Sequence, residues 1–254
     1  MTYRYGELKP AELEQVVRDF GIAVLPIGSL AWHGSHLPYG VDGMIAESFA
    51  ERLADRVDGV LLPTLYAPMT TLPEERSISV RSEVFRGAIF DILGCLKHAG
   101  FRTVCVVTGH HAPGHLVELY EAATAFIGAE LYVIAAAPLE VIEDDSLLDH
   151  GGRWETAQLL AHRPELVDMT SLNGQLTPKK SGIIGEDPRC AKPEEAKQLM
   201  DRALDVWANW VQQPDIRAIE RFYVRRIKVL SGYLEEYAAL SWEQAMKEWW
   251  SAQH

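Results

Sequence analysis

Residues 22–42 read IAVLPIGSLAWHGSHLPYGVD and join an apolar run to a segment with two histidines and a carboxylate. The run, residues 22–27, has the length and composition of a buried strand, and a glycine follows it. His33, His36 and Asp42 come just past the end of that strand, where parallel α/β sheets usually place their ligand sites. This stretch therefore predicts a parallel α/β fold with a metal site at one edge of the sheet.

The rest of the chain repeats the alternation of short apolar runs with longer segments of helical period. Such alternation is typical of βαβ units, so we expect a three-layer α/β/α fold with a mostly parallel central sheet. The predicted strands are residues 21–27, 59–65, 103–108 and 130–137, and the predicted helices are 43–57, 82–99, 114–127, 153–162 and 193–212. Residues 168–191, rich in Gly, Pro and Lys, predict a long loop near a site or an interface.

The chain has 254 residues, of which 48% are hydrophobic, a length that suits one large α/β domain. We expect a single domain over residues 1–254, with a helical, aromatic-rich C-terminal extension from about residue 214. The aromatic residues of that extension include Trp242, Trp249 and Trp250. Such residues more often cover a core or a subunit contact than bind a ligand.

The formal net charge of -12 argues against partners that carry phosphate backbones or anionic lipid head groups. No stretch approaches ~20 uninterrupted apolar residues, and charged residues stand where a signal peptide would need an apolar segment. We therefore expect a cytoplasmic protein that acts on a small molecule, without nucleic acid or membrane partners.

A second group of histidines, His110, His111 and His115, follows the predicted strand 103–108. Neighbouring parallel strands could aim His33, Asp42 and His110 into one crevice. Imidazole with carboxylates suits Zn²⁺, Mn²⁺ or Fe²⁺ better than Ca²⁺ or Mg²⁺, and the lack of a cysteine there argues against a structural zinc cage. The pattern indicates a catalytic metal with an open position.

His150 and Glu155 lie on either side of the turn that enters the predicted helix 153–162. Glu155, in the first turn, could reach back toward the strand ends, while His150 could move a proton. The alternative is that Glu155 only complements the helix dipole.

Four segments together resemble the motifs of the creatininase (creatinine amidohydrolase) family. They are GSLAWHGSHLP at 28–38 with Asp42, TGHHAP at 108–113, HGGRWET at 150–156 and GEDPR at 185–189. Their order and separation agree with the family over about residues 20–212.

The resemblance implies two divalent metals that share Asp42 as a bridging carboxylate. One would take His33 and Glu155, and the other would take His110 and a glutamate two residues before His33. His150 resembles the family's general base and acid. The family commonly assembles as homo-oligomers, often hexamers.

The glutamate that the resemblance implies is Ala31 in this chain. A methyl group cannot bind a cation, and two protein ligands hold a catalytic metal poorly. We therefore favour one ion, with Zn²⁺ first and Mn²⁺ or Fe²⁺ as alternatives, held by His33, Asp42 and Glu155 with His110 close by. A local substitute is the alternative, with His36, His111, Glu74 and Glu75 as the candidates.

These features predict a metal-dependent hydrolase that cleaves a cyclic or small amide C–N bond with a metal-activated water. His150 and Glu155 are the expected catalytic residues, and Trp32, Trp154, His36 and His111 are the expected substrate-binding residues. Two alternatives stay open: hydrolysis of a cyclic keto-sugar of the inosose type, and a catalytically reduced relative that serves as a ligand-binding or assembly subunit.

Overall fold

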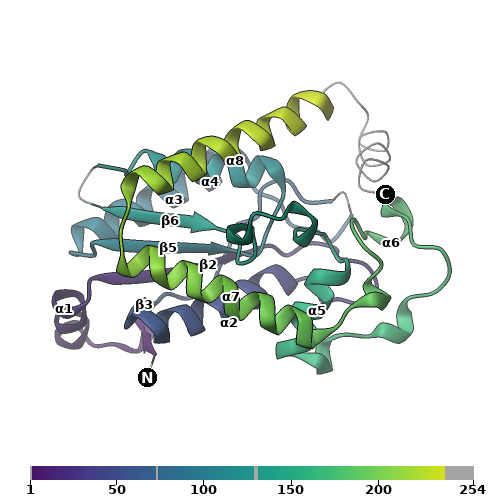
Figure 1. Cartoon of the computed structure of the whole chain (residues 1–254), viewed down its shortest axis with the longest axis horizontal. Helices are drawn as coiled ribbons and strands as arrows, with labels where there is room; N and C mark the ends of the chain where they lie inside the picture. The colour runs from purple at the N-terminus through teal and green to yellow at the C-terminus, as the bar shows by residue number, and fades with distance from the viewer. Residues whose placement is uncertain (1, 73, 129–130, 238–254) are drawn as a thin grey trace.

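The computed structural model describes residues 2–72, 74–128 and 131–237. Figure 1 shows a central sheet with helices on both faces, so the expected three-layer α/β/α architecture is confirmed. Within these residues no helix is both long and apolar enough to cross a membrane.

The sheet of the described residues is parallel throughout, with strand order β1-β3-β2-β5-β6 and with β4 paired to the end of β2. The strands are β1 (Tyr3–Arg4), β2 (Ile22–Gly28), β3 (Val60–Leu61), β4 (Leu65–Tyr66), β5 (Thr103–Thr108) and β6 (Tyr132–Ala136). Every residue of β5 is buried, as expected of a parallel strand covered on both faces. The carboxyl ends of β2 and β5 lie side by side, because Ile27 pairs with Thr108.

Two sets of helices cover the two faces of this sheet (Figure 1). One face carries α2 (Val41–Val57), α5 (Arg153–His162) and α7 (Pro193–Gln212), and the other carries α3 (Ser82–His98), α4 (Pro113–Thr124) and α8 (Ile216–Tyr237). Helix α1 (Pro10–Asp19) precedes β2, and α6 (Pro178–Ser181) lies in the long segment before α7. Short 3-10 helices span Tyr5–Glu7, Glu140–Ile142, Asp145–Leu147, Pro164–Leu166, Met169–Ser171 and Pro188–Cys190.

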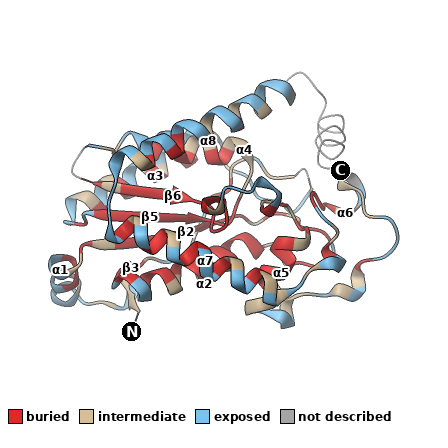
Figure 2. Ribbon diagram, viewed as in Figure 1, coloured by how far each residue is buried: buried red, intermediate tan, exposed pale blue. Residues whose placement is uncertain are grey.

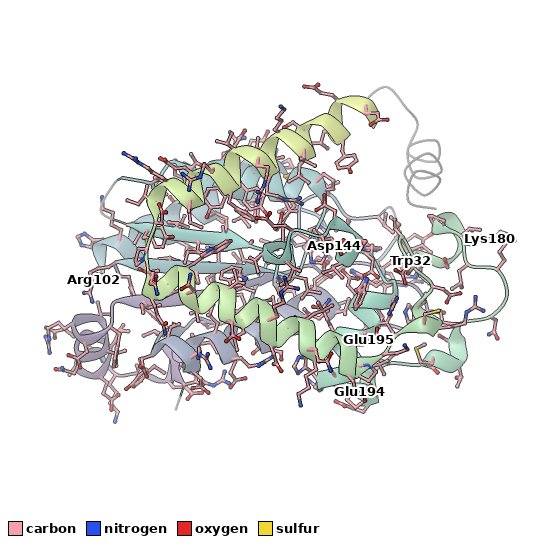
Figure 3. The ribbon with its side chains drawn as sticks, in the orientation of Figure 1. Trp32, Arg102, Asp144, Lys180, Glu194 and Glu195 are labelled. Atoms are coloured by element: carbon pink, nitrogen blue, oxygen red, sulfur yellow. The ribbon has the colours of Figure 1, made fainter. Side chains whose placement is uncertain are left out.

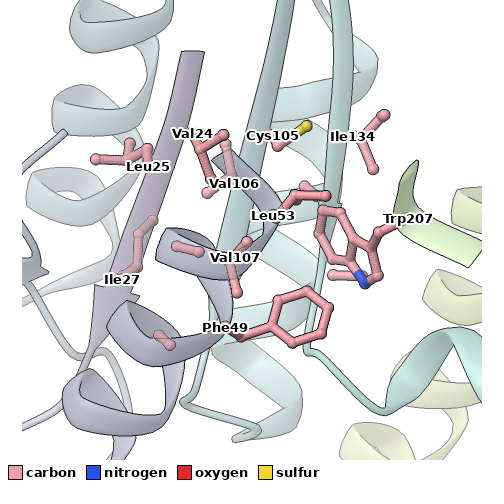
Figure 4. Packing of buried hydrophobic residues seen from close by; sticks show 14 of the residues in the cluster. Val24, Leu25, Ile27, Phe49, Leu53, Cys105, Val106, Val107, Ile134 and Trp207 are labelled. Carbon is pink, nitrogen blue, oxygen red and sulfur yellow. The ribbon is translucent and has the colours of Figure 1, made fainter. Parts of the chain in front are cut away.

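The hydrophobic core lies between the strands and the inward faces of the helices (Figure 2). Phe49 and Leu53 of α2 meet Trp207 of α7 over the sheet (Figure 4), and the Phe49 and Trp207 rings pack edge-on with centroids 5.8 Å apart. Burial of a side chain of this size stabilises the fold by about 1.5–3 kcal/mol. The core therefore holds α2, which carries Asp42, firmly against the sheet.

The predicted helices 153–162 and 193–212 agree with α5 and α7 at both ends. The strand predicted over 59–65 is wrong in its middle, because Pro63 has no N–H to donate and the chain there separates β3 from β4. The predicted loop 168–191 contains α6 and two 3-10 turns. The predicted elements do not include α1 or β1. The two-residue strand β1 is too short for a periodic signal, whereas α1 is amphipathic and begins at Pro10, so its pattern could have been recognised.

Close backbone approaches bring the start of α2 against the ends of β2 and β5. A Cβ at Gly28 would lie 2.2 Å from the Cα of Gly43, and a Cβ at Gly109 would lie 2.0 Å from the carbonyl oxygen of Asp42. Neither contact is sterically allowed, so both positions require glycine. These glycines let Asp42 reach the strand ends.

Helix α8, which lies in the segment from about residue 214 onward, packs on α4. The Tyr223 hydroxyl donates to the carbonyl of Val133 (2.9 Å) and accepts from the N–H of Ala135 (2.7 Å). A side chain of α8 thus satisfies backbone groups at the β6 edge of the sheet. The expectations for Trp242, Trp249 and Trp250 lie outside the described residues.

Candidate metal centre

His33 lies at the centre of a buried cluster beyond the end of β2. Its Nδ1 donates a hydrogen bond to the carbonyl of Ala31 at 2.8 Å, which fixes the ring. Its Nε2 then points at two carboxylates, with Asp42 Oδ1 at 2.9 Å and Glu155 Oε2 at 3.6 Å. The three side chains are at most 2% exposed, so the cluster is closed to bulk solvent.

His33 Nε2 and Asp42 Oδ1 are 2.9 Å apart, within ion-pair distance, but the contact lacks the alignment of a hydrogen bond. Neither His33 Nε2 nor Asp42 Oδ1 has a hydrogen-bond partner among the described residues. Buried polar atoms without partners are rare, because each costs about 1–3 kcal/mol. When His33 is neutral, its Nε2 and Asp42 Oδ1 offer lone pairs that converge on one point, which fits a bound cation. Nitrogen with carboxylate oxygen suits a transition metal.

The charges of the cluster lead to the same conclusion. Burial opposes charge on His33, but Asp42 and Glu155 outweigh it and raise the pKa of His33 to about 9. Burial likewise opposes charge on Asp42, yet His33 and His110 hold the pKa of that carboxyl well below its usual range. Burial raises the pKa of Glu155 well above its usual range, despite the opposing effect of His33. The metal-free cluster thus holds a proton on His33 and favours a second proton on Glu155, and a divalent cation could replace both.

Glu155 is held by the start of α5. Its Oε2 accepts the N–H of Gly151 at 2.6 Å, and its own backbone N–H donates to Asp149 Oδ1 at 3.0 Å. Asp149 Oδ2 also accepts the N–H of Trp154 at 2.7 Å. Asp149 thus stabilises the first turn of α5 as a capping carboxylate does. Asp149 was not among the predicted site residues, because its only signal in the sequence is an acidic residue shortly before a predicted helix.

His150 stacks on His33, with ring centroids 3.9 Å apart. Its Nε2 donates to the carbonyl of Trp32 at 2.8 Å, which leaves a lone pair on Nδ1. Burial and the neighbouring His33 lower the pKa of His150 well below its usual value, so the ring is neutral. His33, His150 and Glu155 each offer a ligand atom within 4.8 Å of the others. His150 is placed either to accept a proton or to contact a metal.

The other predicted histidines also reach this region. His110 Nδ1 lies 3.0 Å from Asp42 Oδ2, and His111 Nδ1 lies 3.7 Å from Glu155 Oε1. His36 Nε2 lies 2.9 Å from the hydroxyl of Thr156, one residue beyond Glu155. Burial lowers the pKa of both His36 and His111 to about 4, so both are neutral at pH 7.

Trp32 and Trp154, the two tryptophans predicted to line the substrate site, each lie within one of the motifs. A Cβ at Gly182 would lie 2.7 Å from the Trp32 ring, so the ring packs on the backbone after α6. Figure 3 shows Trp32 on the side of the molecule that carries Lys180 and Glu195. Trp154 is buried and lies under the Arg153 guanidinium, 4.5 Å from the ring centroid.

Glu74, a candidate substitute for the missing glutamate, has other partners. Its carboxylate accepts the hydroxyl of Tyr39 at 3.0 Å and the side chain of Arg76 at 2.9 Å. It is therefore occupied in a surface ion pair. Among the described acidic residues, only Asp42 has an oxygen within 4 Å of a His110 ring nitrogen.

Comparison with known proteins points to one family. Residues 6–211 match the family model described as creatininase, creatinine amidohydrolase. A creatinine amidohydrolase of Pseudomonas putida is 23% identical over 190 residues, which cover 65% of this chain and 73% of the relative.

Solved creatininase structures share the fold. One described as creatininase Mn is 20% identical, with a TM-score of 0.71, and the match covers 85% of this chain and 100% of that chain. A creatininase variant of the Zn–Zn type is 19% identical with the same TM-score and coverage. A creatininase variant complexed with creatine is 20% identical with a TM-score of 0.69, again covering 85% and 100% of the two chains.

Proposed function

Because the chain belongs to the creatininase (creatinine amidohydrolase) family, we propose that it hydrolyses a cyclic or small amide C–N bond of a small polar molecule. The family match confirms the prediction of a metal-dependent hydrolase, and the substrate is the part that we propose. The observation that carries the proposal is the pair of facing, unpartnered atoms, His33 Nε2 and Asp42 Oδ1. The creatine complex of a structural neighbour supports a substrate of this size.

One divalent ion, Zn²⁺ or Mn²⁺ by analogy with the neighbours, would bind to His33, Asp42 and Glu155. When bound, it supplies a Lewis acid that activates water and polarises a carbonyl oxygen. The geometry supports these three residues because all are buried and His33 is already oriented by Ala31. The Nδ1 of His110 lies 3.0 Å from the other carboxylate oxygen of Asp42, Oδ2.

His150 is the proposed general base and acid. Its hydrogen bond to the Trp32 carbonyl holds the tautomer in which Nδ1 can accept a proton from the attacking water. The same ring would then return the proton to the leaving nitrogen. We assign substrate contacts to Trp32, Trp154, His36 and His111.

The structure weighs against one of the two alternative functions and leaves the other open. A catalytically reduced relative would have no need to keep two facing unpartnered ligand atoms, so the geometry favours the enzyme. A cyclic keto-sugar would use the same carbonyl activation, and that substrate stays a prediction. The single domain, the cytoplasmic location and the homo-oligomer also stay predictions.

The test combines metal analysis with a substrate screen. Purified protein loaded with Zn²⁺ or Mn²⁺ is assayed for bound metal and then for hydrolysis of creatinine, small lactams, formamides and cyclic keto-polyols. His33→Ala should lose both metal and activity, whereas His98→Ala, at the exposed end of α3, should lose neither. Wild-type protein that takes up no metal at micromolar concentrations would contradict the proposal.

A further inference from the structure

The segment between β6 and α5 leads to His150, the proposed general base. It contains the 3-10 helices Glu140–Ile142 and Asp145–Leu147. Backbone hydrogen bonds within the segment, up to Leu148, join residues that are three apart. These bonds shape local turns, so the placement of the segment on the protein depends on its side chains.

Arg226 of α8 joins the two 3-10 helices of this segment. Its Nε donates to Glu140 Oε1 at 2.6 Å, and its Nη1 donates to Asp145 Oδ1 at 2.7 Å. The Arg226 side chain is 10% exposed and the Glu140 side chain 0%, so water competes little for the inner ion pair. One planar guanidinium thus fixes the two turns relative to each other.

The remaining oxygen of Glu140 has partners as well. Oε2 accepts the hydroxyl of Tyr120 in α4 and the backbone N–H of Ala137 at 3.0 Å. A buried ion pair adds little net stability over well-packed apolar side chains, because desolvation opposes it. A network whose members are all hydrogen-bonded does, however, rigidify the elements that it joins.

Helix α8 is a firm base for Arg226. Residues 219, 222, 223 and 226 recur at helical spacing and lie on one face of α8. Ile219 and Phe222 are at most 4% exposed. Tyr223 stacks on Tyr120 with ring centroids 5.3 Å apart, and its hydroxyl bonds the edge of β6. The guanidinium therefore extends from a helix that is fixed to the core.

Other parts of the chain contribute little to this anchorage. Among the described residues, the hydrogen bonds that reach residues 140–148 from distant elements come from Tyr120, Arg225 and Arg226. The pair of Arg225 with Glu143 is exposed, and such pairs are weak. Helix α8 begins at Ile216, beyond the residues 6–211 that match the family model, so Arg226 is not part of that match.

We propose that Arg226 is a positioning residue for His150: by tying Glu140 to Asp145 it holds the segment that sets the His150 ring against His33. On the downstream side His150 is held by two backbone hydrogen bonds with Ile184, of 2.7 Å each. Helix α8 supplies the anchor on the upstream side. This inference rests on the proposed function, because it takes His150 as the general base.

The test measures amide hydrogen exchange and kinetics on the Zn²⁺-loaded full chain. In Arg226→Met, exchange in residues 140–148 should rise about tenfold or more, because the turns lose their anchor. The kcat for the compound hydrolysed in the screen of creatinine, lactams, formamides and keto-polyols should fall about 10–100-fold. KM and bound Zn²⁺ should not change, since no metal ligand contacts α8. Arg226→Lys, which can still pair with Glu140, should recover part of kcat.

Two variants of α8 are the controls. Arg225→Met breaks only the exposed pair, and Tyr223→Phe loosens α8 from β6 without touching residues 140–148. Both should keep wild-type exchange in that segment and wild-type kcat. Equal loss of kcat in Tyr223→Phe and Arg226→Met would overturn the proposal, because the effect would then reflect the docking of α8 in general.

Arg226→Met with wild-type exchange in residues 140–148, or with faster exchange but unchanged kcat, would also overturn it. If Arg226→Met does not fold, Asp145→Ala, which keeps the pair of Arg226 with Glu140, takes its place with the same expected directions. A wild type that hydrolyses none of the screened compounds would instead contradict the proposed function. The exchange measurement would still decide whether Arg226 holds the segment.

Discussion

Metal binding at His33 should compete with a proton. The Nδ1 of His33 donates a hydrogen bond to the Ala31 carbonyl, so a metal must bind to Nε2. In the metal-free protein that nitrogen carries a proton up to about pH 9, because the facing carboxylates raise the pKa of His33 to about 9. Each metal ion bound below that pH must displace this proton.

The size of the effect follows from the pKa. At pH 7 the protonated form of His33 in the metal-free protein exceeds the neutral form about 100-fold. This excess weakens apparent metal binding by roughly 2.7 kcal/mol relative to a pH above the pKa of His33. Affinity should rise about tenfold per pH unit between pH 7 and 9 and level off above. At least one proton should be released per ion at pH 7, and Glu155, whose pKa burial raises, adds to that number.

Isothermal titration calorimetry measures both quantities. Titration with Zn²⁺ in buffers of different ionisation enthalpy gives the protons released, and a pH series with a metal-chelating competitor gives the affinity. Affinity that is constant from pH 7 to 9, with no proton released, would refute the assignment of His33 as a ligand.

Three further predictions concern single positions. His150→Ala should keep the metal while turnover slows by ~10²–10⁴; loss of the metal would instead make His150 a ligand. Gly109→Ala should lower the free energy of unfolding, measured in a urea melt, by ~1–3 kcal/mol or more, because its Cβ would overlap the Asp42 carbonyl. Gly87→Ala in helix α3 has open space around it and should be neutral or slightly stabilising. Equal melts for the two glycine variants would disprove the close approach. Arg226→Met should lower the free energy of unfolding by about 3–5 kcal/mol, because the buried carboxylate of Glu140 would lose its ion-pair partner. Arg225→Met breaks only the exposed ion pair with Glu143 and should cost less than about 1 kcal/mol. Similar losses for the two variants would contradict this difference.

The parts of the site that follow strand ends could be predicted from the sequence. His33 and Asp42 follow β2, His110 follows β5, and the pairing of Ile27 with Thr108 brings these two ends together. A residue's place along a parallel strand is enough to assign it to this edge. The sequence also located Glu155, because it lies in the first turn of a clear helix.

Contacts across the fold could not be predicted in this way. The orientation of His110 depends on the carbonyls of Met69 and Thr70, which belong to an irregular segment about forty residues earlier. Asp149 caps α5 through a turn that only the folded backbone defines. The two-residue strands β3 and β4 are too short for a periodic signal.

The most direct test of a single metal at His33, Asp42 and Glu155 is an anomalous difference map from crystals of the Zn²⁺-loaded protein. The account predicts one peak per chain, bounded by His33 Nε2, Asp42 Oδ1 and the Glu155 carboxylate, with His110 still bonded to the Met69 and Thr70 carbonyls. A second peak between Asp42 and His110, or a single peak elsewhere, would contradict it.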